Sequence, residues 1–187
     1  MDIFIQNISP FILAFLMLIV LFSLVYLIYS IIIFLITGVP FVPTPKKYFK
    51  ILFKEIGLKD SDVVYDLGCG TGIFLFAAKK AGVKNLIGYE LSPALVLIAK
   101  VLNWFKRTKV RFVCGNFMKA DISDATFIYL FLVGPVLPKV WEKIKKETKT
   151  GTIVVSLSSP IPGIEYFKKI KTNPKKKKSS FFYFYKT

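Results

Sequence analysis

A long uncharged stretch opens the hydrophobic pattern of the chain. Residues 3–45 contain no Lys, Arg, Asp or Glu, and residues 11–36 are apolar except for two serines and two tyrosines. A helix over that run is about 39 Å long and exceeds the roughly 30 Å of a hydrocarbon core. A buried core helix of this length normally keeps a polar face, and a signal peptide has a shorter run behind a basic segment. The pattern therefore predicts a transmembrane anchor over residues 1–38.

The flanking charges predict the orientation of this anchor. Only Asp2 precedes the apolar run, whereas four lysines follow it: Lys46, Lys47, Lys50 and Lys54. Because positively charged flanks stay in the cytoplasm, we expect a single-pass membrane protein whose larger part is cytoplasmic. Residues 39–46, which hold three prolines, are interpreted as a proline-rich linker.

Beyond the linker, short apolar runs alternate with segments of helical spacing. This alternation predicts one α/β domain over residues 47–187, built on a largely parallel sheet. A Thr-Asn-Pro turn and four lysines separate the last two runs, so these form an antiparallel hairpin. We expect strands at 63–67, 85–90, 109–114, 125–132, 152–157, 164–171 and 181–186, and helices at 47–57, 72–81, 93–105 and from Pro135 or Pro138 to 148.

The charge of the chain is strongly positive but does not indicate nucleic acid. The formal net charge is +16, and all 27 basic residues follow position 45. Only two are arginines, and the chain is rich in Lys, Ile, Phe and Tyr throughout, which is typical of a compositional bias. Beside a membrane anchor, anionic lipid headgroups are the nearer partner. The lysines at 168, 169, 171 and 175–178 are candidates for that contact; a solvated hairpin loop is the alternative.

The two cysteines and the acidic residues show no metal-ligand spacing. Cys69 falls in a glycine-rich turn and Cys114 at the end of an expected strand. In a reducing compartment a disulfide is not expected, and both are interpreted as small buried hydrophobes. We expect no metal.

The glycine-rich turn carries the chemistry. An expected buried strand is followed by Gly68-x-Gly70-x-Gly72, and the next strand ends at Glu90. Such a turn lets backbone N–H groups approach a ligand, and a carboxylate after the second strand binds ribose hydroxyls. Ile73 stands where a dinucleotide fingerprint has its third glycine, and Asp66 before the turn suits an amino group better than a pyrophosphate. The pattern favours a nucleoside ligand with an amino group.

The segment D-L-G-C-G-T-G resembles motif I of the class I S-adenosylmethionine-dependent methyltransferases. The resemblance implies a Rossmann-like seven-strand methyltransferase sheet and S-adenosyl-L-methionine as cofactor. It places the three glycines at the methionine part, Asp66 at its ammonium group and Glu90 at the ribose. Leu91 would pack on the adenine. Asn116, with Phe117 after it, would accept a hydrogen bond from the adenine amino group, or serve only as a turn residue.

A closer resemblance rests on several segments together. The apolar span, P-F-V-P-T-P, D-L-G-C-G-T-G, G-Y-E-L-S-P, F-L-V-G-P and S-P-I-P are similar to the membrane-tethered lysine methyltransferases. Mitochondrial members of that family modify the ADP/ATP carrier and the small membrane-ring component of ATP synthase. The chain departs from the family at Thr71 and Asn116, where acidic residues are usual. The Lys-rich, His-free composition suggests a prokaryotic relative that acts on some other membrane protein. Thr44, Leu132 and Pro135 are the substrate-side candidates.

The chain contains no histidine, which bears on the acceptor. Methyl transfer to a hydroxyl generally needs a base or a metal, and histidine is the usual base near neutral pH. A lysine amine needs only to lose its proton, which an apolar site favours. The base-methyltransferase signature after strand four is absent. Two alternatives stay open: a lipid or small-molecule methyltransferase, and a cofactor-binding module without catalysis.

Overall fold

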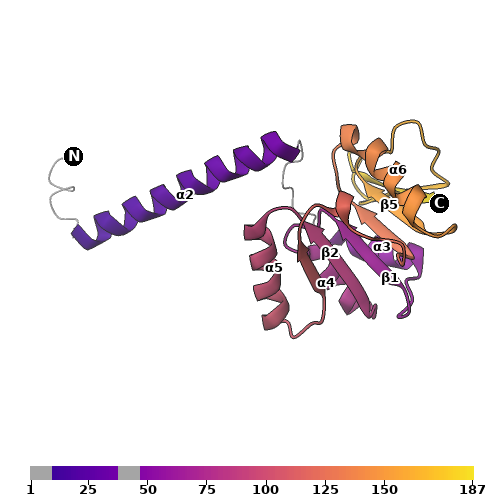
Figure 1. Ribbon diagram of the computed structural model, residues 1–187, viewed down its shortest axis with the longest axis horizontal. Coiled ribbons are helices and arrows are strands. Elements are labelled where there is room, and N and C mark those ends of the chain that lie inside the picture. Colours follow the sequence, from indigo (N-terminus) through magenta and orange to yellow (C-terminus); the bar gives the residue numbers. More distant parts are fainter. Residues whose placement is uncertain (1–9, 38–46) are drawn as a thin grey trace. The chain divides into compact units, whose positions relative to one another are not determined.

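The computed structural model describes residues 10–37 and 47–187, and the chain divides into two compact units, Met1–Pro40 and Phe41–Thr187 (Figure 1). The described part of the first unit is one helix, α2 (Pro10–Thr37), which begins at a proline, as helices often do. Its side chains over residues 10–28 are all exposed. By length and composition, Pro10–Tyr29 qualifies as a candidate membrane span. The expected linker, with Thr44, lies outside the described residues.

The second unit is a seven-stranded sheet flanked by helices. The strand order is β3-β2-β1-β4-β5-β7-β6; β1 to β5 are parallel, and β7 is antiparallel to both β5 and β6. This is the Rossmann-like methyltransferase sheet expected from the sequence. The strands are β1 (Val63–Leu67), β2 (Asn85–Glu90), β3 (Arg111–Cys114), β4 (Phe127–Leu130), β5 (Ile153–Leu157), β6 (Lys168–Lys171) and β7 (Phe181–Lys186). The helices are α3 (Lys47–Ile56), α4 (Ile73–Lys80), α5 (Pro93–Phe105) and α6 (Leu137–Glu147), with short 3-10 turns η1 (Phe117–Lys119) and η2 (Gly134–Val136).

The central strands are apolar on both faces, as parallel strands covered by helices must be. All four residues of β4 are buried. Phe127 and Tyr129 belong to the core cluster that the helices α3 and α4 share. The alternation of side chains turns Ile128 to the opposite face. The glycine-rich turn therefore follows a strand, β1, that is buried beside β4 in the centre of the sheet.

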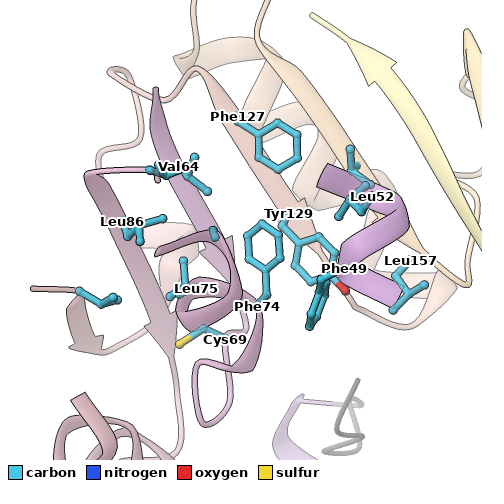
Figure 2. Close-up of a cluster of buried hydrophobic side chains, with 14 of the residues drawn as sticks. Phe49, Leu52, Val64, Cys69, Phe74, Leu75, Leu86, Phe127, Tyr129 and Leu157 are labelled. Atoms are coloured by element: carbon cyan, nitrogen blue, oxygen red, sulfur yellow. The ribbon is translucent and has the colours of Figure 1, made fainter. Parts of the chain in front are cut away.

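Aromatic side chains join α3 to this core (Figure 2). Phe49 of α3 is buried and makes edge contacts with Phe74 of α4 at 5.5 Å and with Tyr129 at 6.0 Å between ring centroids. Phe74 and Tyr129 stack at 4.1 Å. Leu52, on the same face of α3, is fully buried. The helix expected directly after the linker is therefore part of the folded domain.

Four strands are shorter than the sequence predicts. β3 begins at Arg111 and not at residue 109, and β5 begins at Ile153 and not at residue 152. The expected strand over residues 125–132 pairs only at Phe127–Leu130, because Leu132 beyond it is buried by packing rather than by the ladder. The expected strand over 164–171 pairs only at Lys168–Lys171. The first residues of the expected strand follow a turn, in which the Ile164 N–H donates to the Ile161 carbonyl, and pairing with β7 begins only at Lys168. None of these differences changes the topology.

Candidate active site

The turn after β1 adopts the backbone geometry that its glycines allow. Gly68, Gly70 and Gly72 have φ values of 88°, 53° and 79°, and the N–H groups of Gly68 and Cys69 both donate to the carbonyl of Tyr89, at 2.8 and 2.9 Å. A Cβ atom on Gly72 would lie 2.5 Å from the ring of Phe112. Only glycine fits at that position, and the turn is held against both β2 and β3.

A second close approach, at Gly88 of β2, holds the turn from the other side. A Cβ atom there would lie 2.6 Å from Leu75 Cδ1 and 2.7 Å from Cys69 Sγ. In the sequence, Gly88 is only the first residue of the segment G-Y-E-L-S-P, and no role was predicted for it. The available signal was a glycine inside a strand, which often marks a close approach of another backbone or side chain.

Glu90 links the loops that follow three strands. Its Oε2 accepts a hydrogen bond from the Gly70 N–H and its Oε1 from the Ser92 N–H, both at 2.9 Å. Its backbone carbonyl accepts from the Gly115 N–H at 2.9 Å. The carboxyl ends of β1, β2 and β3 thus converge on one residue, Glu90. Its carboxylate keeps further lone pairs that can accept from a ligand hydroxyl.

Asp66 lies one strand away and is buried, with 3% of its surface exposed. Burial, reinforced by the charge of Glu90, raises the pKa of its carboxyl well above the ordinary value. No residue in 10–37 or 47–187 makes a side-chain hydrogen bond to this carboxyl. A buried carboxyl of this kind is a ready partner for a cationic group, which would lower its pKa again.

The residues expected at the adenine lie after β2 and β3. The Asn116 Oδ1 accepts a hydrogen bond from the Met118 N–H at 2.9 Å and caps η1, so Asn116 serves as a turn residue. Its side chain is exposed and keeps one acceptor lone pair and two donors. Phe117 is half-buried and Leu91 is 38% exposed. All three are at the same edge of the sheet as Glu90.

The substrate-side candidates divide into three cases. Leu132 is buried against the turn: a Cβ atom on Gly68 would lie 3.1 Å from Leu132 Cδ2. Pro135 is exposed in η2. Thr44 lies outside the described residues. The end of β4 therefore meets the turn after β1, as the order of strands requires.

The cysteines differ in environment. Cys69 is buried inside the turn, and its burial raises the pKa of the thiol, which excludes a nucleophilic thiolate at neutral pH. Cys114 is exposed at the end of β3, contrary to the expectation that both cysteines are buried. The expectation was wrong for Cys114 because this residue ends β3, the edge strand of the sheet, which has a neighbouring strand on one side only.

The arrangement fits a nucleoside that carries an amino acid. Three structures lie along one edge of the sheet: a turn with three glycines, the Glu90 carboxylate and the buried Asp66 carboxyl. The model for the ANTKMT methyltransferase domain matches residues 66–168, more than half of the chain. The chain belongs to the ANTKMT methyltransferase-domain family. It is an enzyme of the class I methyltransferases with S-adenosyl-L-methionine as cofactor.

The curated relatives carry related names. A protein-lysine N-methyltransferase of Saccharolobus islandicus is 38% identical over 128 residues, which cover 67% of this chain and 80% of the relative. The rat lysine N-methyltransferase named for the C component of ATP synthase is 27% identical over 66% of this chain, and the mouse adenine nucleotide translocase lysine N-methyltransferase 33% over 52%. The chain spans about half the length of these two mammalian relatives, 57% and 43% respectively. The predicted membership in a family of lysine methyltransferases is confirmed.

A solved structure agrees with this assignment. An RNA methyltransferase of Salinibacter ruber, in complex with S-adenosyl-L-homocysteine, has a TM-score of 0.70 and 28% identity. The alignment covers 78% of this chain and 93% of the relative. The fold and cofactor predicted from the sequence are both confirmed, and the individual contacts of the cofactor stay predictions.

Proposed function

We propose that this enzyme methylates a lysine side chain of an integral membrane protein. In this proposal α2 anchors it in the same membrane, with the α/β domain on the cytoplasmic side. The main support for a lysine acceptor is the segment after β4, residues 131–136, which has no ionisable side chain and lies next to the glycine turn.

The cofactor contacts follow from the geometry. The glycine turn would hold the methionine part, with Asp66 at the ammonium group, while Glu90 would accept from the ribose hydroxyls. Leu91, Asn116 and Phe117 would surround the adenine. When bound, the cofactor supplies an electrophilic methyl group; the chain's residues hold and orient it and exclude water.

The exit of β4 favours an amine acceptor. Residues 131–136 are Phe-Leu-Val-Gly-Pro-Val, with no ionisable side chain, and Leu132 contacts the glycine turn. An ammonium group that enters apolar surroundings loses its proton more readily, because desolvation disfavours the charged form. A lysine therefore reaches the methyl donor as a neutral nucleophile with no histidine to deprotonate it. Proximity and orientation then contribute most of the rate.

The membrane substrate is supported by two independent features. Two of the relatives are named for membrane-embedded targets, the C component of ATP synthase and the adenine nucleotide translocase. This chain carries α2, long and apolar enough to cross a bilayer. Anchoring enzyme and substrate in one membrane raises their effective concentration. The cationic flank at Lys46 to Lys54 supports the cytoplasmic orientation.

The test is methylation of native membranes. The purified full-length protein is incubated with radiolabelled S-adenosylmethionine and membranes of its own organism, and protein, lipid and RNA are then separated. We expect label in a protein band, which is lost on protease digestion and recovered as methylated lysine after hydrolysis. Label in the organic phase would replace the proposal with a lipid methyltransferase, and label in RNA with a nucleic-acid one.

Two variants separate loss of function from lack of substrate. Glu90→Ala should abolish the label, whereas Glu142→Ala, which removes an exposed carboxylate on α6, should leave it unchanged. If no fraction is labelled although S-adenosyl-L-homocysteine binds, the enzyme does not act on these membranes and the proposal fails.

A further inference from the structure

Helix α5 is apolar on the face that it turns to solvent as well as on the face that it buries. Val96 and Ala99 are buried in the core cluster, and α5 packs against β2 and β3. The opposite face carries an exposed apolar stripe, with exposures from 45% to 74%: Leu97, Ile98, Val101, Trp104 and Phe105. Helices that are apolar all round are normally covered on both sides. Within the described residues these side chains are exposed, and α5 lies on the outside of the α/β domain (Figure 1).

The segment that carries the stripe has basic but no acidic residues. Residues 91–120 contain no Asp or Glu but six basic residues: Lys100, Lys106, Arg107, Lys109, Arg111 and Lys119. Both arginines of the chain are among them. A second copy of this chain would bring like charges together, so the charge pattern opposes self-association. It complements an anionic surface.

An open hollow lies at the carboxyl end of α5. The hollow, of about 590 Å³, is lined by Lys100, Asn103, Trp104, Phe105, Arg107 and Thr108. The rings of Trp104 and Phe105 meet edge to face at 4.8 Å, and both side chains are mostly exposed. Trp and Phe beside Lys and Arg are the side chains that proteins place at the boundary between headgroups and acyl chains.

Arg107 occupies a position where glycine is usual. Its φ is 49°, and its N–H donates to the Trp104 carbonyl at 3.0 Å, which ends the helix. A side chain in this left-handed conformation is strained, because its Cβ approaches the backbone closely. The neighbouring loop is fixed: the Asn103 amide donates to the Val110 carbonyl at 3.0 Å. Arg107 therefore extends from a hydrogen-bonded turn and is one of the residues that line the hollow.

We infer that α5 is a lipid-binding face of the domain. The stripe enters the interfacial layer of an anionic bilayer, and Lys100, Lys106 and Arg107 bind phosphate headgroups at the hollow. The helix begins at Pro93, and its N-cap Ser92 is two residues after Glu90. With α5 on the bilayer, the cofactor site opens close to the membrane surface. This contact is distinct from the span α2 and does not depend on which acceptor is methylated.

The two tryptophans make the test direct, because Trp104 is 74% exposed and Trp141 is 4% exposed. The full-length protein is reconstituted into vesicles of phosphatidylcholine and phosphatidylglycerol, with or without bromine on the acyl chains, and tryptophan emission is recorded. Bromine quenches only tryptophan that reaches the acyl region. We expect strong quenching in the parent and almost none in Trp104→Phe, which keeps only Trp141. Equal quenching in both proteins, or none in either, overturns the inference.

Matched charge variants test the headgroup contact. Lys106→Gln/Arg107→Gln and Lys145→Gln/Lys146→Gln, on α6, remove the same charge. At about fivefold in partitioning for each cation near the surface, only the first pair should reduce the quenching, as should replacement of phosphatidylglycerol by phosphatidylcholine. Arg107→Gly should weaken the contact while keeping the fold. If quenching changes neither with lipid charge nor in either double variant, the hollow does not bind phosphate headgroups.

Discussion

The Oε2 atom of Glu90 lies 2.9 Å from the backbone nitrogen of Gly70, which joins the end of β2 to the turn after β1. The same carboxylate accepts from Ser92 at the start of α5. One side chain thus fixes the backbone around the cofactor site and is the candidate ligand for the ribose. Its removal should affect both the turn and the binding of the cofactor.

Glu90→Gln is expected to weaken binding of S-adenosyl-L-homocysteine by tenfold or more, since a hydrogen bond to a charged group contributes about 1.5–3 kcal/mol. The amide nitrogen of glutamine would also face one of the two backbone N–H donors. Titration calorimetry measures the dissociation constant. Glu142→Gln, on the exposed face of α6, is the control and should bind like the parent. If the two variants bound S-adenosyl-L-homocysteine with equal affinity, Glu90 would not be a ligand of the cofactor.

Asp66 predicts a pH dependence of stability. Its pKa is raised, first by burial and then by the charge of Glu90, so the folded protein keeps a proton that the unfolded chain loses above about pH 4. The folded state then binds more protons, and the contribution of Asp66 to the free energy of unfolding falls by about 1.4 kcal/mol per pH unit. That loss continues until the raised pKa is reached.

The comparison is with Asp66→Asn, by thermal unfolding without cofactor from acidic to neutral pH. The stability of the variant relative to the parent should increase as the pH rises and then level off. A difference that is constant with pH would show that Asp66 is ionised in the folded protein.

Cofactor binding should ionise Asp66, because an ammonium group beside the carboxyl favours its charged form. Calorimetric titration with S-adenosyl-L-homocysteine in two buffers of different ionisation enthalpy should show proton release by the parent. Asp66→Asn should show none and bind more weakly. Proton release that persists in this variant would place the ammonium group elsewhere.

Gly72→Ala should destabilise the domain through a clash as well as through its backbone. Its φ is 79°, and the new Cβ would meet the ring of Phe112 at 2.5 Å. Gly82→Ala is the control, because its φ is 104° but no heavy atom lies within 4 Å of its Cβ. We expect the first variant to lose about 1–3 kcal/mol more in urea unfolding.

The double variant Gly72→Ala/Phe112→Leu isolates the contact between the turn and β3. A smaller side chain at position 112 should recover part of the loss, with a coupling energy of about 0.5–3 kcal/mol. Strict additivity would show that the turn moves to accommodate the Cβ without Phe112.

Phe49→Ala should show that α3 is an integral part of the domain. Phe49 is 1% exposed and contacts Phe74 and Tyr129, so truncation should cost about 3–5 kcal/mol. Phe53, on the same helix, is half-buried, and Phe53→Ala should cost less. Thermal unfolding of both variants measures the difference. Equal small losses would indicate that α3 is detachable.

Local sequence signals predicted the bounds of an element correctly where capping or turn residues mark its ends. Helix α5 runs from Pro93 to Phe105 as expected, because Ser92 caps it and the Ser92 Oγ accepts from the Leu95 N–H. The strands Asn85–Glu90 and Phe181–Lys186 also match. The end of β4 was misplaced because apolar character does not distinguish a ladder residue from one packed against a loop, as Leu132 is.

The sequence predicted which residues form the candidate site but not the contacts between them. Asp66 and Glu90 stand out in the sequence because they are acidic residues in largely apolar strands. The glycines stand out because three of them occur in five residues. The bond from Gly70 to Glu90 depends on the register that sets Leu67 against Tyr89. The packing of Phe112 on Gly72 depends on β3, which is distant in the chain. Such contacts follow from the assembled sheet and carry no local signal.

The contrast between the two cysteines gives the protein a natural attachment point for a probe. Cys114 is exposed, and in the β2–β3 ladder it lies opposite Glu90. Cys69 is buried, with a pKa raised by burial, and is protected from alkylation. A maleimide dye added to the unmodified protein would therefore label one thiol at the rim of the cofactor site. Changes in its emission would report occupancy of the site in real time, without any substitution in the chain.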